Sequence, residues 1–238
     1  TGIHLGAYGI DLPTRPTLAD ACRTALSLPE LRRLRLGSLE SVELSADLLS
    51  LMRTEPRFAA HLHLPLQAGS DAVLRAMNRH YDTAAFAHLL SEVRSAVPGV
   101  AISTDIIVGF PGETEEQFDE GLRFVRAMGF SRLHVFPYSP RKGTPAAART
   151  DQVPGALRRE RAARMQALAG ALSEQFHHAS LGRVAPVLFE REAGGVFDGL
   201  TDTYIRVYTD APVSRGEMVP MHLMRLYRDG VWGCRTAP

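Results

Sequence analysis

The chain has 238 residues, of which 45% are hydrophobic and 22% charged, and its formal net charge at pH 7 is +1. These values are ordinary for a globular protein. No apolar run approaches the roughly 20 residues that a membrane-spanning helix needs, and no basic-then-apolar signal segment opens the sequence. The composition therefore argues against a membrane partner.

Cysteine usage and charge indicate the cellular setting and the kind of partner to expect. The two cysteines, Cys22 and Cys234, lie far apart in the sequence, which argues against a disulfide framework and favours a reducing, cytoplasmic setting. Cys22 falls in a helical stretch and is expected to be a small buried residue. Nearly all cations are arginines, Lys142 being the only lysine, but no segment is basic enough to indicate nucleic-acid binding by itself.

Strand-like and helix-like segments alternate through residue 148. The helices are expected over residues 17–28, 46–53 and 83–96, from near Asp71, and from Thr114 to about Met128; the strands are expected over residues 34–36, 60–66, 101–108 and 132–136. Repeated strand–loop–helix units predict a parallel sheet with ligands at the carboxyl ends of the strands. Four units are too few to close a barrel of six or eight strands, so we expect further units to precede Thr1.

The pattern changes after residue 148. Residues 155–179 read as one long helix rich in alanine and arginine, expected to be a connector with an exposed charged face, although its arginines could also meet RNA. Five short segments with turn signals follow, over residues 184–189, 195–200, 204–208, 218–226 and 231–235. They predict a small β-barrel of the oligonucleotide-binding type. We divide the chain into residues 1–148, 149–181 and 182–238.

Three loop motifs come where predicted strands end: residues 61–71, 103–114 and 136–145. Their glycines let a ligand approach the backbone closely. An adenosine ligand also needs polar side chains at the strand ends, and five residues of suitable type occur there: Ser38, Glu40, Gln67, Ser70 and Asp105. The alternative is that they cap helices or complete turns, as Ser70, Asp71 and Thr114 could. Capping does not require Gln67 or Asp105.

Two histidines on one predicted strand are possible metal ligands. His61 and His63 alternate on one strand and face the same side, so a metal site is conceivable. No carboxylate or cysteine stands close to them in sequence. An orienting or core role is therefore favoured, and no metal ligands are assigned.

The three motifs, together with Arg35-x-Gly37-Ser38-x-Glu40, resemble the radical S-adenosylmethionine methylthiotransferases. Residues 182–238 resemble the TRAM domain of that family, most recognisably from Gly199 to Val207. The residues from Thr1 to Gly9 are similar to the MtaB-like branch, which modifies N6-threonylcarbamoyladenosine in tRNA. The resemblance implies the carboxy-terminal part of a partial (β/α)6 barrel followed by a small all-β TRAM barrel.

The resemblance also implies a site and its cofactors. S-adenosylmethionine would be bound by Gly2, Ser38, Glu40, Gln67, Ser70, Asp105, Gly109 and Phe110, and tRNA by Arg141, Lys142, Tyr204 and Arg206. The family carries two [4Fe-4S] clusters, each on a set of three cysteines, and receives sulfur from a donor. Neither cysteine set is present, so this chain alone is expected to be inactive, as part of an enzyme that is a monomer when full length.

Three other interpretations stay open. The chain could be a non-catalytic RNA-binding or scaffold protein that kept half a barrel and a TRAM module, although the balanced charge of residues 182–238 argues against RNA affinity strong enough to stand alone. It could belong to the isopentenyladenosine (MiaB-type) or the ribosomal-protein (RimO-type) branch of the same family. It could also be a different radical enzyme, a hypothesis that the TRAM-like residues 182–238 disfavour.

Overall fold

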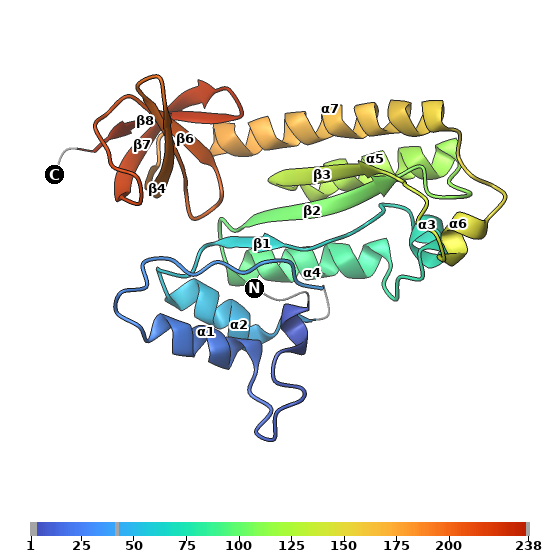
Figure 1. Ribbon diagram of the computed structural model, residues 1–238, viewed down its shortest axis with the longest axis horizontal. Helices are drawn as coiled ribbons and strands as arrows, with labels where there is room; N and C mark the ends of the chain where they lie inside the picture. The colour runs from blue at the N-terminus through green and yellow to red at the C-terminus, as the bar shows by residue number, and fades with distance from the viewer. Residues whose placement is uncertain (1–3, 41–42, 237–238) are drawn as a thin grey trace.

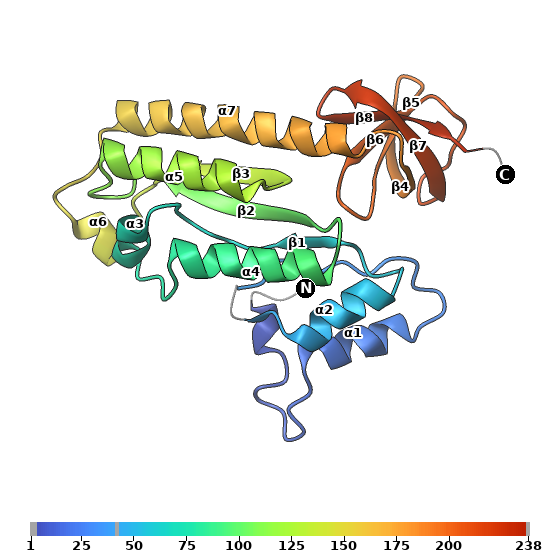
Figure 2. The same ribbon diagram turned by 180° about the vertical axis from the view of Figure 1, so that it is seen from behind.

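The computed structural model describes residues 4–40 and 43–236. A three-stranded parallel sheet with helices on one side forms the larger part, and the long helix α7 connects it to a small β-barrel (Figures 1 and 2). Within the described residues, no helix is long and apolar enough to cross a membrane. The architecture matches the predicted α/β part followed by an all-β barrel.

The sheet has the order β1-β2-β3 with all strands parallel. Its strands are β1 (His61–His63), β2 (Ala101–Val108) and β3 (Arg132–Pro137). The helices before α7 are the 3-10 turn η1 (Leu5–Ala7) and the α-helices α1 (Leu18–Leu26), α2 (Ala46–Thr54), α3 (Asp71–Ala76), α4 (Thr83–Ala96), α5 (Glu115–Met128) and α6 (Pro145–Ala148). The Thr114–Gln117 capping box predicted for α5 is present.

Two predicted strands are shorter than expected. Residues 34–36 form a single bridge, Leu34 with Phe58, and residues 60–66 keep regular pairing only over β1. Pro65 has no N–H to donate to the ladder. Backbone pairing with β2 resumes two residues later, where Gln67 bridges to Ile106. The prediction was therefore wrong about strand length and right about strand position.

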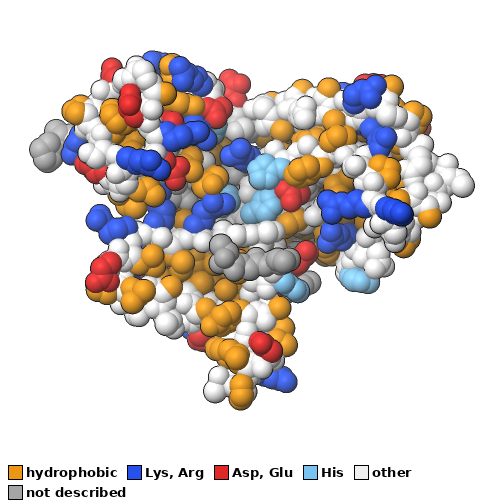
Figure 3. All heavy atoms as spheres, in the orientation of Figure 1, with side chains coloured by type: hydrophobic (Ala, Val, Ile, Leu, Met, Phe, Trp, Pro, Cys, Tyr) orange, Lys and Arg blue, Asp and Glu red, His pale blue; other side chains and the backbone are white. Residues whose placement is uncertain are grey.

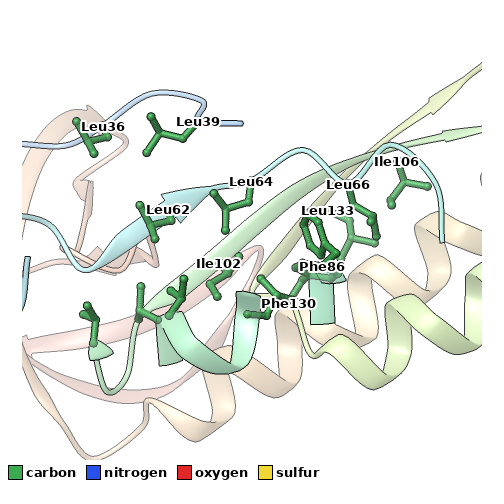
Figure 4. Packing of buried hydrophobic residues seen from close by; sticks show 14 of the residues in the cluster. Leu36, Leu39, Leu62, Leu64, Leu66, Phe86, Ile102, Ile106, Phe130 and Leu133 are labelled. Carbon is green, nitrogen blue, oxygen red and sulfur yellow. The ribbon is translucent and has the colours of Figure 1, made fainter. Parts of the chain in front are cut away.

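The two faces of the sheet differ in chemistry because side chains alternate along a strand. Leu62 and Ile102 point to the same side and pack with Phe86 of α4, Phe130 and Leu133 in a buried apolar core (Figure 4). The opposite face carries histidine, serine and aspartate side chains, which are described below as part of the site. Burial of the apolar face against the helices provides the driving force that fixes the sheet.

Helix α7 (Gly155–Ala179) packs along β3 and α5 through Ala162, Met165, Leu168 and Leu172, which are all buried. Its arginines do not form the wholly exposed face that the sequence suggested. Arg161 is only 2% exposed and forms an ion pair with Glu113 at 3.1 Å, while Arg164 pairs with Glu115 and with Asp119. The helix is thus held to the sheet layer by charge as well as by apolar contact.

The barrel that follows is closed in the order β4-β5-β6-β8-β7. Its strands are β4 (Val184–Ala193), β5 (Val196–Leu200), β6 (Arg206–Thr209), β7 (Met218–Tyr227) and β8 (Gly230–Arg235). Val187, Phe189, Val207, Met221 and Val231 fill its interior. All five predicted strand positions are confirmed, and closure leaves no unpaired edge.

The barrel is also joined directly to the sheet layer. Arg33 donates hydrogen bonds to the carbonyl oxygens of Pro186 (2.7 Å) and Leu200 (2.9 Å). The Tyr204 ring lies 3.8 Å from the Arg35 guanidinium carbon and 5.1 Å from the His61 ring. Burial, with the nearby charge of Arg35, lowers the pKa of His61 to about 3, so this histidine is neutral at physiological pH.

Arg161→Ala is expected to destabilise the fold strongly, because it leaves Glu113 buried without its charged partner. Loss of one member of a buried ion pair typically costs about 3–5 kcal/mol. Urea unfolding of the full chain measures the change in free energy of unfolding. Arg159→Ala, at an exposed position of the same helix, is the control and is expected to change stability by less than about 0.5 kcal/mol. Equal effects of the two substitutions would rule out this role for the pair.

His61 is expected to make the fold sensitive to acid. Its pKa is about 3 when folded and about 6.5 when unfolded, so below pH 6.5 only the unfolded state takes up the proton. Stability is therefore lost as the pH falls from 6.5 towards 3, by about 5 kcal/mol at most. Urea unfolding of the His61→Phe variant between pH 7 and pH 4 is expected to show a clearly smaller loss than wild type. Some pH dependence will remain, because burial also lowers the pKa of His177. Identical pH profiles would contradict the assignment.

Candidate functional site

A cavity of about 470 Å³ opens at the carboxyl ends of β2 and β3. Its wall is mostly apolar with a few polar groups, which is the usual character of a small-molecule site. The lining residues are Gln67, Asp105, Ile107, Phe110, Phe136, Pro137, Tyr138, Ser139, Arg141, Thr144 and Ala146. All of them except Ala146 come from the three loop motifs that the sequence singled out.

Gln67 lies on the loop that follows β1 and holds an unusual backbone conformation. Its φ is +73°, in the left-handed region that costs a residue with a side chain roughly 1 kcal/mol or more. The conformation is fixed from both sides: the Gln67 N–H donates to the Asp105 carbonyl at 2.9 Å, and its own carbonyl accepts from the Ile107 N–H at 2.8 Å. A side chain kept at such a position is a candidate for function.

The loop after β2 forms another wall. Gly109 has a φ of +72°, and a Cβ there would lie 2.3 Å from the Arg158 side chain of α7, so only glycine fits. The Glu113 carboxylate accepts from the N–H groups of Gly109 (2.8 Å) and Phe110 (3.3 Å), which closes the loop on itself. Burial raises the pKa of Glu113, against the effect of these two donors and of Arg161. The Phe110 ring then meets the Tyr138 ring edge to face, with centroids 5.3 Å apart.

Polar side chains continue from the cavity along the face of the sheet that points away from the helices, which we call the inner face. Asp105 on β2 lies between two histidines: its Oδ2 is 3.3 Å from His63 Nε2, and its Oδ1 is 3.1 Å from His134 Nδ1. Desolvation opposes ionisation, but the hydrogen bonds and charges of His63 and His134 prevail and lower the pKa of Asp105. Figure 3 shows histidine side chains beside an acidic one in the middle of this face.

The structure brings some of the predicted cofactor residues together and separates others. Gln67, Asp105 and Phe110 line the cavity, together with Arg141, which was predicted to meet RNA. Ser38 bridges to His63 beside the site, and the Glu40 carboxylate is 3.7 Å from Arg79. Gly2 lies outside the described residues.

Two further predicted residues support the site without lining it. Gly109 forms the turn described above. Ser70 is 1% exposed and lies on the helix-covered side of the loop, where the structure shows no hydrogen-bond partner for its Oγ. Neither residue lines the cavity, and their predicted role in binding the cofactor remains a prediction.

The predicted RNA-binding residues fall in two places. Arg141 and Lys142 are exposed on the loop after β3. Tyr204 stacks between the sheet and the barrel as described above, and Arg206 forms ion pairs with Asp198 and Asp229. Their contact with RNA remains a prediction.

His134 was missed by the sequence interpretation. Its signal was present, because residues 132–136 were recognised as a strand and alternate residues of a strand share a face. What the sequence could not supply is the register that sets His134 opposite Asp105. The sequence analysis found no carboxylate close to His63, and the structure supplies Asp105, which is distant in sequence but lies 3.3 Å from His63 Nε2.

Comparison with known proteins finds relatives of one class. Residues 14–125 match the model of the Radical SAM superfamily. The threonylcarbamoyladenosine tRNA methylthiotransferase MtaB of Bacillus subtilis is 37% identical over 212 residues, covering 87% of this chain and 47% of the relative. The tRNA-2-methylthio-N(6)-dimethylallyladenosine synthase of Acidothermus cellulolyticus is 42% identical over 193 residues, covering 81% of this chain and 39% of the relative.

A solved structure supports the fold. Coproporphyrinogen III oxidase (HemN) from Escherichia coli, a radical SAM enzyme, superposes with a TM-score of 0.53 at 17% identity over 80% of this chain and 52% of that one. The chain belongs to the radical SAM superfamily. Within that superfamily its relatives are the tRNA methylthiotransferases of the MtaB and MiaB types, and the chain spans less than half the length of each of the two relatives named above.

The superfamily implies an iron–sulfur cluster, which needs several thiolates at one place. This chain has two cysteines. Cys22 is buried in α1 within the apolar core, and Cys234 is exposed on β8 of the barrel. The cysteines of this chain therefore do not fit a cluster, whereas the cavity at the strand ends has the apolar wall and few polar groups of a small-molecule site.

Proposed function

We propose that this chain is part of an enzyme that methylthiolates C2 of N6-threonylcarbamoyladenosine in tRNA. The observation that carries the proposal is the cavity at the carboxyl ends of β2 and β3, which all three loop motifs build and which belongs to a chain related to tRNA methylthiotransferases. The ligand of this cavity would be S-adenosylmethionine, which supplies radical chemistry in this superfamily when a cluster is present.

The side chains of the cavity suit the adenosyl part of that ligand. Phe110 and Ile107 offer apolar surface on which a purine ring can lie, and the Tyr138 ring, which also lines the cavity, packs edge to face against Phe110. The ionised Asp105 accepts hydrogen bonds from ribose hydroxyls, and the Gln67 amide both donates and accepts. These residues bind and orient the ligand; within the described residues, none is placed to hold the cluster.

The threonylcarbamoyl branch is supported by the charge at the rim. Arg141 lines the cavity, and Lys142 is exposed next to it. A threonylcarbamoyl group carries a carboxylate, which pairs with a guanidinium, whereas a dimethylallyl group carries no charge. The B. subtilis relative named for threonylcarbamoyladenosine points the same way. The loop cations would also contact the phosphates of the tRNA.

Two finer points complete the proposal. A cytoplasmic location follows from the substrate, because tRNA is modified there. This chain by itself would be inactive, since its two cysteines cannot hold a cluster that splits S-adenosylmethionine. Sulfur would be delivered to the enzyme by a donor outside this chain.

Gln67→Ala in the full-length enzyme is expected to weaken S-adenosylmethionine binding about tenfold, because one or two hydrogen bonds to the ligand are lost. Isothermal titration calorimetry measures the affinity. Gln166→Ala, at an exposed position on α7, removes a matched side chain that does not line the cavity and should leave the affinity unchanged. Unchanged binding in Gln67→Ala as well would remove Gln67 from the site.

Deletion of the gene is expected to abolish the methylthio form of threonylcarbamoyladenosine and to leave the unmethylthiolated nucleoside in its place. Mass spectrometry of nucleosides from total tRNA measures both. Loss of the methylthio-dimethylallyl nucleoside instead would assign the protein to the other branch. An unchanged nucleoside profile would favour a non-catalytic role.

A further inference from the structure

The inner face of the sheet holds a group of three side chains that neither the proposed S-adenosylmethionine pocket nor a tRNA contact explains as a set. His63 from β1, Asp105 from β2 and His134 from β3 each offer one ligand atom, and these atoms all lie within 4.8 Å of one another. Three adjacent parallel strands therefore contribute one ligand each. We propose that these three residues form a binding site for a divalent transition-metal ion such as Zn²⁺ or Fe²⁺.

The distances suit a cation. Zinc binds histidine nitrogen and carboxylate oxygen at about 2.0–2.2 Å, so neighbouring ligand atoms in a tetrahedral site are about 3.4 Å apart. Asp105 Oδ2 lies 3.3 Å from His63 Nε2, and Asp105 Oδ1 lies 3.1 Å from His134 Nδ1. The ring centroids of His63 and His134 are 5.4 Å apart. At this separation, small side-chain rotations can bring a nitrogen of each ring onto one ion. Two histidines and one carboxylate are a ligand set typical of zinc and non-haem iron.

The surroundings of His63 support the same assignment. Its Nδ1 lies 2.9 Å from Ser103 Oγ, which in turn lies 3.1 Å from His61 Nε2. A metal-bound histidine usually holds its second nitrogen in such a hydrogen bond, which fixes the ring orientation and the tautomer. Ser103 and His61 are both buried, so this support is rigid. His63 Nε2 is then left free to face Asp105.

The site would have open coordination positions. The side chains of His63, Asp105 and His134 are 13%, 25% and 42% exposed, so the cluster is progressively more accessible towards β3. Three protein ligands with an open side are the pattern of metal sites that also bind water or a substrate oxygen. Asp105 lines the cavity described above, and an ion on it would lie next to whatever ligand the cavity holds.

A competing arrangement uses protons only. His63 and His134 can each donate an N–H to Asp105, and this network needs no ion. The two arrangements differ in their response to added metal. A proton network gains nothing from Zn²⁺ or Co²⁺. A metal site binds one equivalent and is stabilised against unfolding by RT ln(1 + M/Kd), where M is the free metal concentration, so the gain grows with the logarithm of that concentration.

The test is titration of the metal-free full chain with Co²⁺ alone, followed by visible absorption, with Zn²⁺ competition and isothermal titration calorimetry in parallel. We expect one equivalent of Co²⁺ with the intense absorption bands of a four- or five-coordinate ion, displaced by Zn²⁺. Asp105→Asn and His134→Phe are expected to lower the affinity at least tenfold. Ser103→Ala is expected to weaken it about tenfold, as loss of such a hydrogen bond does elsewhere.

His88→Ala is the matched control, because His88 forms a surface pair with Glu92 on α4, at 3.6 Å, outside the cluster. It should leave Co²⁺ binding unchanged. Urea unfolding without metal shows whether each variant is folded. If His134→Phe does not fold, the nearly isosteric Asp105→Asn still tests the proposal. No stoichiometric binding to the wild type, or equal binding to Asp105→Asn, would overturn the proposal. Because neither S-adenosylmethionine nor RNA is present, this outcome leaves the proposed function untouched.

Discussion

The buried ion pair between Arg161 and Glu113 is the interaction on which the arrangement of the molecule depends. Glu113 uses one oxygen to accept from the Gly109 and Phe110 N–H groups and the other to accept from Arg161 at 3.1 Å. The loop that forms a wall of the cavity and the helix that leads to the barrel are therefore fixed by one carboxylate. A buried charge is costly unless every lone pair and proton is satisfied, and here several partners on both sides meet that demand.

The second constraint is the alternation of side chains along β2. Ile102, Ile106 and Val108 face the helices and are almost completely buried, whereas Ser103 and Asp105 face the inner side with the histidines. One strand thus contributes to the hydrophobic core and to the site at once. A shift of register by one residue would exchange the two faces, placing Asp105 in the core and Ile106 at the site. The apolar face therefore fixes the site geometry through its own packing.

Local patterns were enough to predict most of the fold. Helix α4 and strand β2 begin and end where the periodicity and the flanking residues indicated, and all five barrel strands are found. Gln67 and Asp105 were predicted at the site from the strand ends and from the resemblance, and Phe110 was predicted from the resemblance alone. Prediction failed where a residue depends on a partner far away in sequence. Arg161 read as an exposed cation on a polar helix, and only the packing of α7 on the loop after β2 makes it a core residue.

His134 shows the same limit within the site. The sequence placed His134 on a strand, but it could not place it beside Asp105, because that contact depends on the register between two strands. Ser70 is the converse case, since its motif suggested a ligand contact and its position on the helix-covered side makes it buried. The direction of a side chain after a strand end follows from backbone dihedrals such as the positive φ of Gln67, which no residue pattern specified.

The joint between sheet and barrel sets what each of its residues can do for RNA. The Tyr204 ring packs against both Arg35 and His61. Turning this ring towards RNA would expose the buried His61 and break the Arg35–Tyr204 contact between the sheet and the barrel. Arg206 pairs with Asp198 and with the exposed Asp229, and ion pairs that solvent reaches are worth only about 0–1 kcal/mol. A phosphate can therefore replace Asp229 as a partner of Arg206 at little cost. Of the two barrel residues predicted to bind tRNA, Arg206 is the one that can do so without disturbing the joint.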